Sequence, residues 1–219
     1  MTLFIVVYLL ALCCYFYTRV SDNKKYRAIN KYIMATMYLV LAIVTFFKKY
    51  NFVSYQSLYM AALIFAYFGD VFLVIDFSRG GDFFLACNIC FTIYEQIVLL
   101  DHCYTIKNYY WLYIIEAIIL FSFIYACSKY PEKIKMGKMR WPMTFYLSTI
   151  LTHGFTGLAL IIYLPGTNFV TLGIGSLLFM ISDMILTAYR FIFNNNKWLI
   201  RANSLTYFVG LLLIVLSMV

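Results

Sequence analysis

The chain has 219 residues, of which 64% are hydrophobic and 12% are charged, and its mean hydropathy is +0.85. A soluble domain of this size has too little interior to bury that much apolar surface, which excludes a soluble globular fold. The formal charge of +8 does not indicate a nucleic-acid partner, because Lys and Arg gather in short segments between apolar runs, where they set topology and face anionic headgroups.

A membrane-spanning helix needs about 20 mostly apolar residues, and the sequence contains a series of runs of this kind. The first run ends without a small-residue cleavage site, so we expect a helix there and not a signal peptide. The sequence therefore predicts an all-α fold: a polytopic membrane protein forming an eight-transmembrane-helix bundle, with residues 1–219 as a single transmembrane domain. In chain order the predicted spans are residues 2–18, 30–47, 53–75, 83–100, 109–128, 142–163, 169–189 and 198–218.

The segments between the spans are short, and their charges are sorted between the two sides. With eight spans, one side of the membrane holds all of the 17 Lys and Arg residues except Lys48, Lys49 and Lys107. This bias predicts that the basic side is cytoplasmic and that both termini are non-cytoplasmic. We expect the endoplasmic reticulum membrane in a eukaryotic host and the cytoplasmic membrane in a bacterial one.

Metal ligands are sparse in the sequence. Cys87 and Cys90 have the spacing of a redox or metal motif, but no second pair accompanies them, and small apolar packing explains them as well. There are two histidines, and His102 lies in a predicted loop. Zinc hydrolysis needs several convergent ligands, so we expect no metal and no cofactor.

Five ionisable residues fall inside the predicted spans, where such groups are costly and often functional. Asp70 and Asp183 lie roughly 10–13 Å from the cytoplasmic ends of the third and seventh spans, since a helix rises about 1.5 Å per residue. Glu95, Glu116 and His153 lie roughly 20 Å from the same side. The alternative for each is a structural hydrogen bond to a neighbouring helix.

Polar neighbours extend some of these positions into stripes along one helix face. Such stripes are expected to face the interior of the bundle or a wet cavity. They consist of Asn88, Thr92 and Glu95; of Thr149, His153 and Thr156; and of Asn203 and Tyr207.

The segments around the two aspartates resemble each other. Phe68–Leu73 and Ile181–Leu186 both read apolar, small, Asp, two apolar, Leu, and Asp183 follows Asp70 by 113 positions. The same offset carries Tyr94 onto Tyr207. This pattern is consistent with a 4+4 internal repeat.

Two nearby carboxyl groups can divide acid and base roles between them. That division suits hydrolysis through an oxocarbenium ion, as in glycosidases. A vinyl ether hydrolyses in the same way: an acid protonates the alkene carbon, and a carboxylate stabilises the cation and activates water. No Gly-x-Ser-x-Gly turn is present, so a serine hydrolase site is not indicated.

The motifs Gly69-Asp70-x-x-Leu73, Ser182-Asp183-x-x-Leu186 and Ser204-x-x-Tyr207-Phe208 resemble those of the YhhN family. That family includes lysoplasmalogenases, which are eight-span membrane enzymes. The resemblance implies cleavage of the vinyl ether bond of lysoplasmalogen to a fatty aldehyde and glycerophosphocholine or glycerophosphoethanolamine.

Three positions depart from the family pattern. Glu95 stands where the family usually has a His, Tyr32 follows Lys31 where it has Pro, and Leu211 stands where Gln is common. Glu95 is a candidate to replace the histidine in proton transfer; the alternatives are a different substrate or no activity.

We expect Asp70 and Asp183 to be the catalytic acid/base pair, with the lysophospholipid substrate and membrane lipids as partners. Apolar aromatic side chains would hold the alkenyl tail, and an acidic lining would favour the cationic headgroup amine. The competing interpretation is a non-enzymatic carrier or lipid-binding protein with proton-coupled acids; the oligomeric state is left open. The residues expected to contact substrate are Glu95, Tyr207, His153, Asn88, Asn203 and Lys31.

Overall fold

The computed structural model of the chain is all-helical in its described residues, which are 2–49, 55–134, 136–193 and 196–218. The predicted start of the third span at 53–54 lies outside them, as do Lys135 and parts of two predicted loops. The elements are α1 Thr2–Thr18, α2 Lys24–Lys49, α3 Gln56–Ile75, α4 Phe77–Asp101, α5 Ile106–Lys129, a short 3₁₀ helix Gly137–Met139, α6 Arg140–Tyr163, α7 Asn168–Phe191 and α8 Lys197–Leu216.

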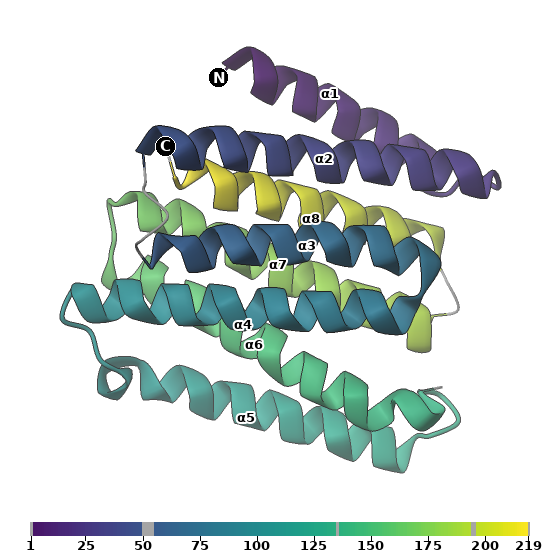
Figure 1. Ribbon diagram of the computed structural model, residues 1–219. Helices are drawn as coiled ribbons and strands as arrows, with labels where there is room; N and C mark the ends of the chain where they lie inside the picture. Colours follow the sequence, from purple (N-terminus) through teal and green to yellow (C-terminus); the bar gives the residue numbers. More distant parts are fainter. Residues whose placement is uncertain (1, 50–54, 135, 194–195, 219) are drawn as a thin grey trace.

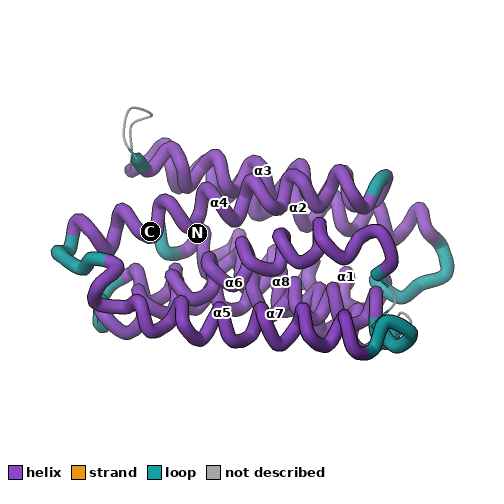
Figure 2. The backbone as a smooth tube through the Cα atoms, turned by 90° about the horizontal axis from the view of Figure 1, so that it is seen from below, coloured by secondary structure: helices purple, strands orange, loops and turns teal. Residues whose placement is uncertain are grey.

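The helices alternate in direction, and both termini lie at the same end of the bundle (Figure 1). A view turned by 90° shows the loops gathered at the two ends of a roughly parallel array (Figure 2). Within the described part of the chain, seven helices, α2 to α8, are long and apolar enough to cross a membrane. Helix α1 is apolar but has 17 residues. The architecture is thus that of a multi-pass membrane protein, while the eighth span and the 4+4 repeat stay predictions.

Several helices begin earlier than the apolar runs predicted. Helix α4 starts at Phe77, because Asp76 is extended (φ −143°, ψ 118°) and its carboxylate accepts from the backbone N–H of Ser78 at 2.8 Å. This N-cap accepts a hydrogen bond from a backbone N–H group of the first helical turn, which would otherwise have no acceptor within the helix. A Cβ on Gly80 would lie 2.7 Å from the Leu73 backbone nitrogen, so the glycine lets α3 and α4 approach closely at this turn.

The interior of the bundle is centred on α7, which packs against α6 on one side and α8 on the other. A Cβ on Gly175 would lie 2.8 Å from the Gly210 carbonyl oxygen, and Gly157 and Gly173 face each other in a similar way between α6 and α7. The absence of a side chain at these positions lets the backbones of α6, α7 and α8 approach closely. Helix α5 lies at the margin of the bundle and packs chiefly against α6 (Figure 1).

Candidate active site

Asp70 lies on α3 and is buried, with 1% of its surface exposed. The Lys31 ammonium of α2 contacts its Oδ1 at 3.1 Å. Its Oδ2 accepts hydrogen bonds from the hydroxyls of Tyr207 on α8, at 2.8 Å, and Tyr38 on α2, at 3.3 Å. Two helices, α2 and α8, therefore supply three donors to one carboxylate, which is the usual way in which a buried charge is compensated.

Asp183 lies on α7 and is 4% exposed. The Tyr146 hydroxyl of α6 donates to its Oδ2 at 2.8 Å. Asn203 of α8 donates to the carbonyl oxygen of the preceding residue, Ser182, at 2.7 Å, and so fixes this turn of α7. Within the described chain no cation forms an ion pair with Asp183. The two aspartates therefore sit in different surroundings.

Both aspartates line one small cavity of about 30 Å³. A buried polar cavity of at least about 10–15 Å³ has room for a water molecule. The two acids of α3 and α7 therefore converge on a space large enough for water, with Lys31, Asn203 and Tyr207 in its wall. The other lining residues are Tyr15, Arg19, Leu73, Phe84, Leu186, Ser204 and Phe208.

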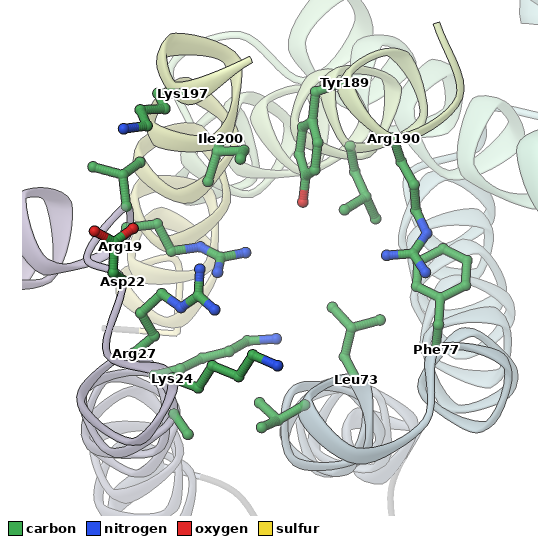
Figure 3. A pocket seen from close by; sticks show the side chains of 15 residues that line it. Arg19, Asp22, Lys24, Arg27, Leu73, Phe77, Tyr189, Arg190, Lys197 and Ile200 are labelled. Carbon is green, nitrogen blue, oxygen red and sulfur yellow. The ribbon is translucent and has the colours of Figure 1, made fainter. Parts of the chain in front are cut away.

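A wider cavity of about 520 Å³, here called the vestibule, shares Arg19, Lys31, Leu73 and Leu186 with the small cavity. It lies where α1, α2, α3, α4, α7 and α8 end or begin, and Figure 3 shows the side chains of Arg19, Arg27 and Arg190 turned toward its open centre. Its polar members are Arg19, Asp22, Lys24, Arg27, Lys31, Tyr189, Arg190 and Lys197.

A third cavity of about 290 Å³, here called the apolar groove, runs between α4 and α6. It shares Leu73, Phe84 and Leu186 with the small cavity. Phe145, at 61% exposed, lies at its outer edge and would face lipid. The remaining lining is Phe77, Ser78, Gly81, Asp82, Leu85, Met139, Pro142, Met143 and Tyr146. The acid pair thus borders both a polar and an apolar space.

A second cluster of buried polar side chains, here called the deep cluster, lies further along the bundle. The His153 ring of α6 stands 3.4 Å from Glu95 Oε1 of α4, and its Nδ1 lies 3.2 Å from Asn88 Oδ1. Ser176 of α7 donates to Glu95 Oε1 at 2.6 Å, and Phe91 stacks on the imidazole at 5.0 Å between ring centroids. All of these residues are fully buried.

The two clusters share one face of α6. The Tyr146 hydroxyl donates to Asp183, and His153, seven residues further along the helix, belongs to the deep cluster.

The predicted site residues divide into two groups in the structure. Lys31, Asn203 and Tyr207 lie with the aspartates around the small cavity. Asn88, Glu95 and His153 were expected to line the same cavity, but they are not among its lining residues and pack into the deep cluster instead. Depth along a helix is readable from sequence, whereas the direction in which each stripe faces depends on its neighbours.

Glu116, expected at the depth of Glu95 and His153, does not join them. The Thr152 hydroxyl of α6 donates to Glu116 Oε1 at 2.7 Å. Thr152 precedes His153 in sequence and therefore faces a different side of α6. Glu116 lies in the α5–α6 contact at the margin of the bundle, consistent with a structural hydrogen bond.

Sequence reasoning missed Tyr38 and Tyr146, although a signal for both exists. Tyr38 follows Lys31 by seven positions, and His153 follows Tyr146 by seven, so each pair shares a helix face. The two leucines of the aspartate motifs were also assigned no role from the sequence. Leu73 and Leu186 follow their aspartates by three residues and line the small cavity, the vestibule and the apolar groove alike.

Among the described residues, no group of three or more His, Cys, Asp or Glu side chains is arranged to hold a metal ion.

The sequence model of the YhhN family matches residues 29–218. The match covers most of the chain, including both aspartates and every residue of the two clusters. No curated protein and no solved structure matched the chain. The chain belongs to the YhhN family.

Proposed function

We propose that the chain is an intramembrane lipid hydrolase of the lysoplasmalogenase type, which cleaves the vinyl ether bond of lysoplasmalogen. The observation that carries this proposal is that Asp70 and Asp183, from separate helices, line one water-sized cavity between a polar vestibule and an apolar groove. Family membership supports it, since the YhhN family includes lysoplasmalogenases.

The surroundings of the two acids assign their roles. Asp70 is paired with the Lys31 ammonium and accepts two further hydrogen bonds, an arrangement that favours the carboxylate form. Asp183 lacks a paired cation in the described chain and holds one tyrosine hydrogen bond. Asp183 is therefore assigned as the general acid, and Asp70 as the general base that also stabilises positive charge.

The reaction balances with these two groups and one water. Asp183 transfers its proton to the alkene carbon that is not bonded to the ether oxygen, which gives an oxocarbenium ion and an Asp183 carboxylate. Asp70 removes a proton from water as the water oxygen bonds to the cationic carbon, forming a hemiacetal. The hemiacetal hydroxyl then loses a proton and the glycerol oxygen gains one, which breaks the carbon–oxygen bond. The products are a fatty aldehyde and a glycerophospho-alcohol, and the proton on Asp70 restores Asp183.

The two larger cavities fit the two ends of this substrate. The apolar groove reaches the lipid-facing side through Phe145 and would take the alkenyl tail, whereas the vestibule opens at the end of the bundle, where the basic residues lie. If that end is cytoplasmic, as the charge sorting predicts, the substrate would enter from the cytoplasmic leaflet.

The experiment that tests this proposal uses purified full-length chain in vesicles with lysoplasmalogen, and follows aldehyde release. Asp183→Asn and Asp70→Asn are each expected to lower the rate by 10²–10⁴-fold, on the order of what general acid–base catalysis contributes. The matched control is Glu116→Gln, which neutralises another buried carboxyl outside the small cavity and is expected to retain activity.

Full activity in either aspartate variant would overturn the mechanism. Uptake or binding of the lipid with no aldehyde produced by the wild-type chain would favour the alternative, a carrier or lipid-binding protein. Against that alternative, both aspartates lie inside continuous helices, whereas many transporter sites use helices broken at the site.

A further inference from the structure

The vestibule is strongly cationic, and the proposed reaction leaves its charge unexplained. Its lining includes six basic side chains and a single acidic one. The basic residues are Arg19, Lys24, Arg27, Lys31, Arg190 and Lys197, and the acidic one is Asp22. A concave surface of one sign concentrates a ligand of the opposite sign.

We propose that the vestibule binds the phosphate group of a lysophospholipid, so that a phosphodiester on the glycerol is required for tight binding. This inference rests on the proposed function and deepens it, because it names the part of the substrate that selects against neutral ether lipids such as alkenylglycerols.

Apart from Lys31, the vestibule cations form no ion pair with a carboxylate among the described residues. Lys31 pairs with Asp70. Arg19 donates to the Ser204 hydroxyl at 3.0 Å, and Arg190 lies over the Phe77 ring at 3.7 Å from its centroid. Both contacts fix the position of a guanidinium without cancelling its charge, which leaves it available for an anion.

The arrangement differs from basic residues that merely set topology. The α5–α6 turn also carries several cations, which the predicted topology places on the same side of the membrane as the vestibule. Of these, Lys129 and Lys133 lie over tyrosine rings and line none of the three cavities. The vestibule cations come instead from Arg19, directly after α1, and from α2, α7 and α8, and they line a common space (Figure 3). Convergence from separate helices is what a phosphate site requires and what a topology signal does not.

The position of the vestibule matches the geometry of the substrate. Lys31 lines both the vestibule and the small cavity, so its ammonium stands between the space for the phosphate and the acid pair. A phosphate in the vestibule leaves the glycerol to pass Lys31 and places the ether bond near Asp70 and Asp183. The tail then continues past Leu73 and Leu186 into the apolar groove.

This assignment reverses the expectation that an acidic lining attracts the headgroup amine. The two aspartates lie behind Lys31, and the mouth through which the headgroup enters carries positive charge. The amine would therefore point outward, and the phosphate inward.

The test is a binding experiment with the purified full-length chain in detergent. The probes are a saturated alkyl-ether lysophosphocholine, which has no vinyl ether to hydrolyse, and the matching alkylglycerol, which has no phosphate. We compare wild type with a Lys24→Ala/Arg27→Ala variant and with a Lys129→Ala/Lys133→Ala control of equal charge change. The vestibule variant is expected to weaken lysophosphocholine binding by about tenfold or more, as charge-assisted hydrogen bonds to phosphate are lost.

Alkylglycerol binding should be equal in all three proteins, and the control should match wild type for both probes. Raising salt should weaken binding of the phosphate lipid alone. Equal affinity of the wild type for the two probes, or equal losses in the two variants, would overturn the inference. A competition with inorganic phosphate gives a further check. If phosphate displaces the lipid at a concentration far below that at which the lipid binds, the vestibule is a site for a free anion, and the inference is overturned.

The inference and the proposed function can fail separately, because the binding experiment measures no turnover and the vesicle assay measures aldehyde release. Phosphate-dependent binding without aldehyde release from lysoplasmalogen would remove the hydrolase proposal alone. Aspartate-dependent hydrolysis that is indifferent to the vestibule variant would remove the phosphate assignment alone.

Discussion

The acid pair and the deep cluster place similar residue types in the same bundle but in different surroundings. Around Asp70 and Asp183 the side chains leave a cavity of about 30 Å³ that adjoins the vestibule. Around Glu95 and His153, both fully buried, Phe91 and Ser176 occupy the space. The comparison teaches that an acid within a membrane helix marks a candidate site only where packing also leaves room for water and substrate.

The two clusters also differ in how the charge of their carboxyl groups is compensated. Asp70 has a cation and two hydroxyl donors, whereas Glu95 has a serine hydroxyl and a neighbouring imidazole. Glu95 Oε2 and His153 Nε2 have no hydrogen bond among the described residues. We therefore expect substitutions in the acid pair to affect chemistry most, and substitutions in the deep cluster to affect folding most.

The largest expected effect is on catalysis by the acid pair. Asp183→Asn should lower aldehyde release on the order of 10²–10⁴-fold, because the amide cannot donate a proton as a carboxylic acid does. Thermal unfolding should change little, since Tyr146 can donate to the amide oxygen in place of Oδ2. A comparable loss of activity in Glu95→Gln would erase the distinction between the two clusters.

The next effect is on stability at the entrance to the site. Lys31→Met should destabilise the fold by about 3–5 kcal/mol, because it leaves the Asp70 charge buried without its cation. Adding Asp70→Asn should recover most of that stability without restoring activity. Unfolding in detergent, followed by circular dichroism, gives the free energies. Equal stability of the single and double variants would show that the Lys31–Asp70 pair is not energetically coupled.

A smaller effect is expected from the deep cluster. Glu95→Gln keeps an acceptor for Ser176 but alters the contact with His153, and should cost about 1–3 kcal/mol of unfolding free energy. Activity should fall less than tenfold, because Glu95 is not among the residues that line the small cavity. Steady-state kinetics beside an unfolding curve check both parts. Unchanged stability with lost activity would move Glu95 into the catalytic machinery.

The smallest effect is expected at the fourth buried acid, Glu116, which belongs to neither cluster. Thr152→Val removes the hydroxyl that donates to Glu116 at 2.7 Å and should cost about 1 kcal/mol, with no change in activity. The control is Ser122→Ala, which also removes a hydroxyl from a helix. Ser122 is exposed on α5, and its hydroxyl donates to the Ile118 carbonyl oxygen of the same helix. A loss of activity in Thr152→Val would show that the bundle margin communicates with the acid pair.

The sequence by itself determined the helical class, most of the spans and which residues are costly to bury. These follow from local properties: apolar run length, the rise of a helix per residue, and the three-residue spacing that puts Leu73 beside Asp70. It also identified five residues that now surround the small cavity: Lys31, Asp70, Asp183, Asn203 and Tyr207.

Only the tertiary structure decided which polar stripes meet, because the direction in which a helix face points is fixed by neighbouring helices and not by its own sequence. The packing brought Tyr146 to Asp183 and Tyr38 to Asp70, and it turned Glu95 and His153 away into the deep cluster. It also gathered cations from α2, α7, α8 and the residue after α1 around one space, although in sequence these cations look like ordinary topology signals. Charge sorting along a chain records which side of the membrane a residue lies on, but not whether it faces a cavity.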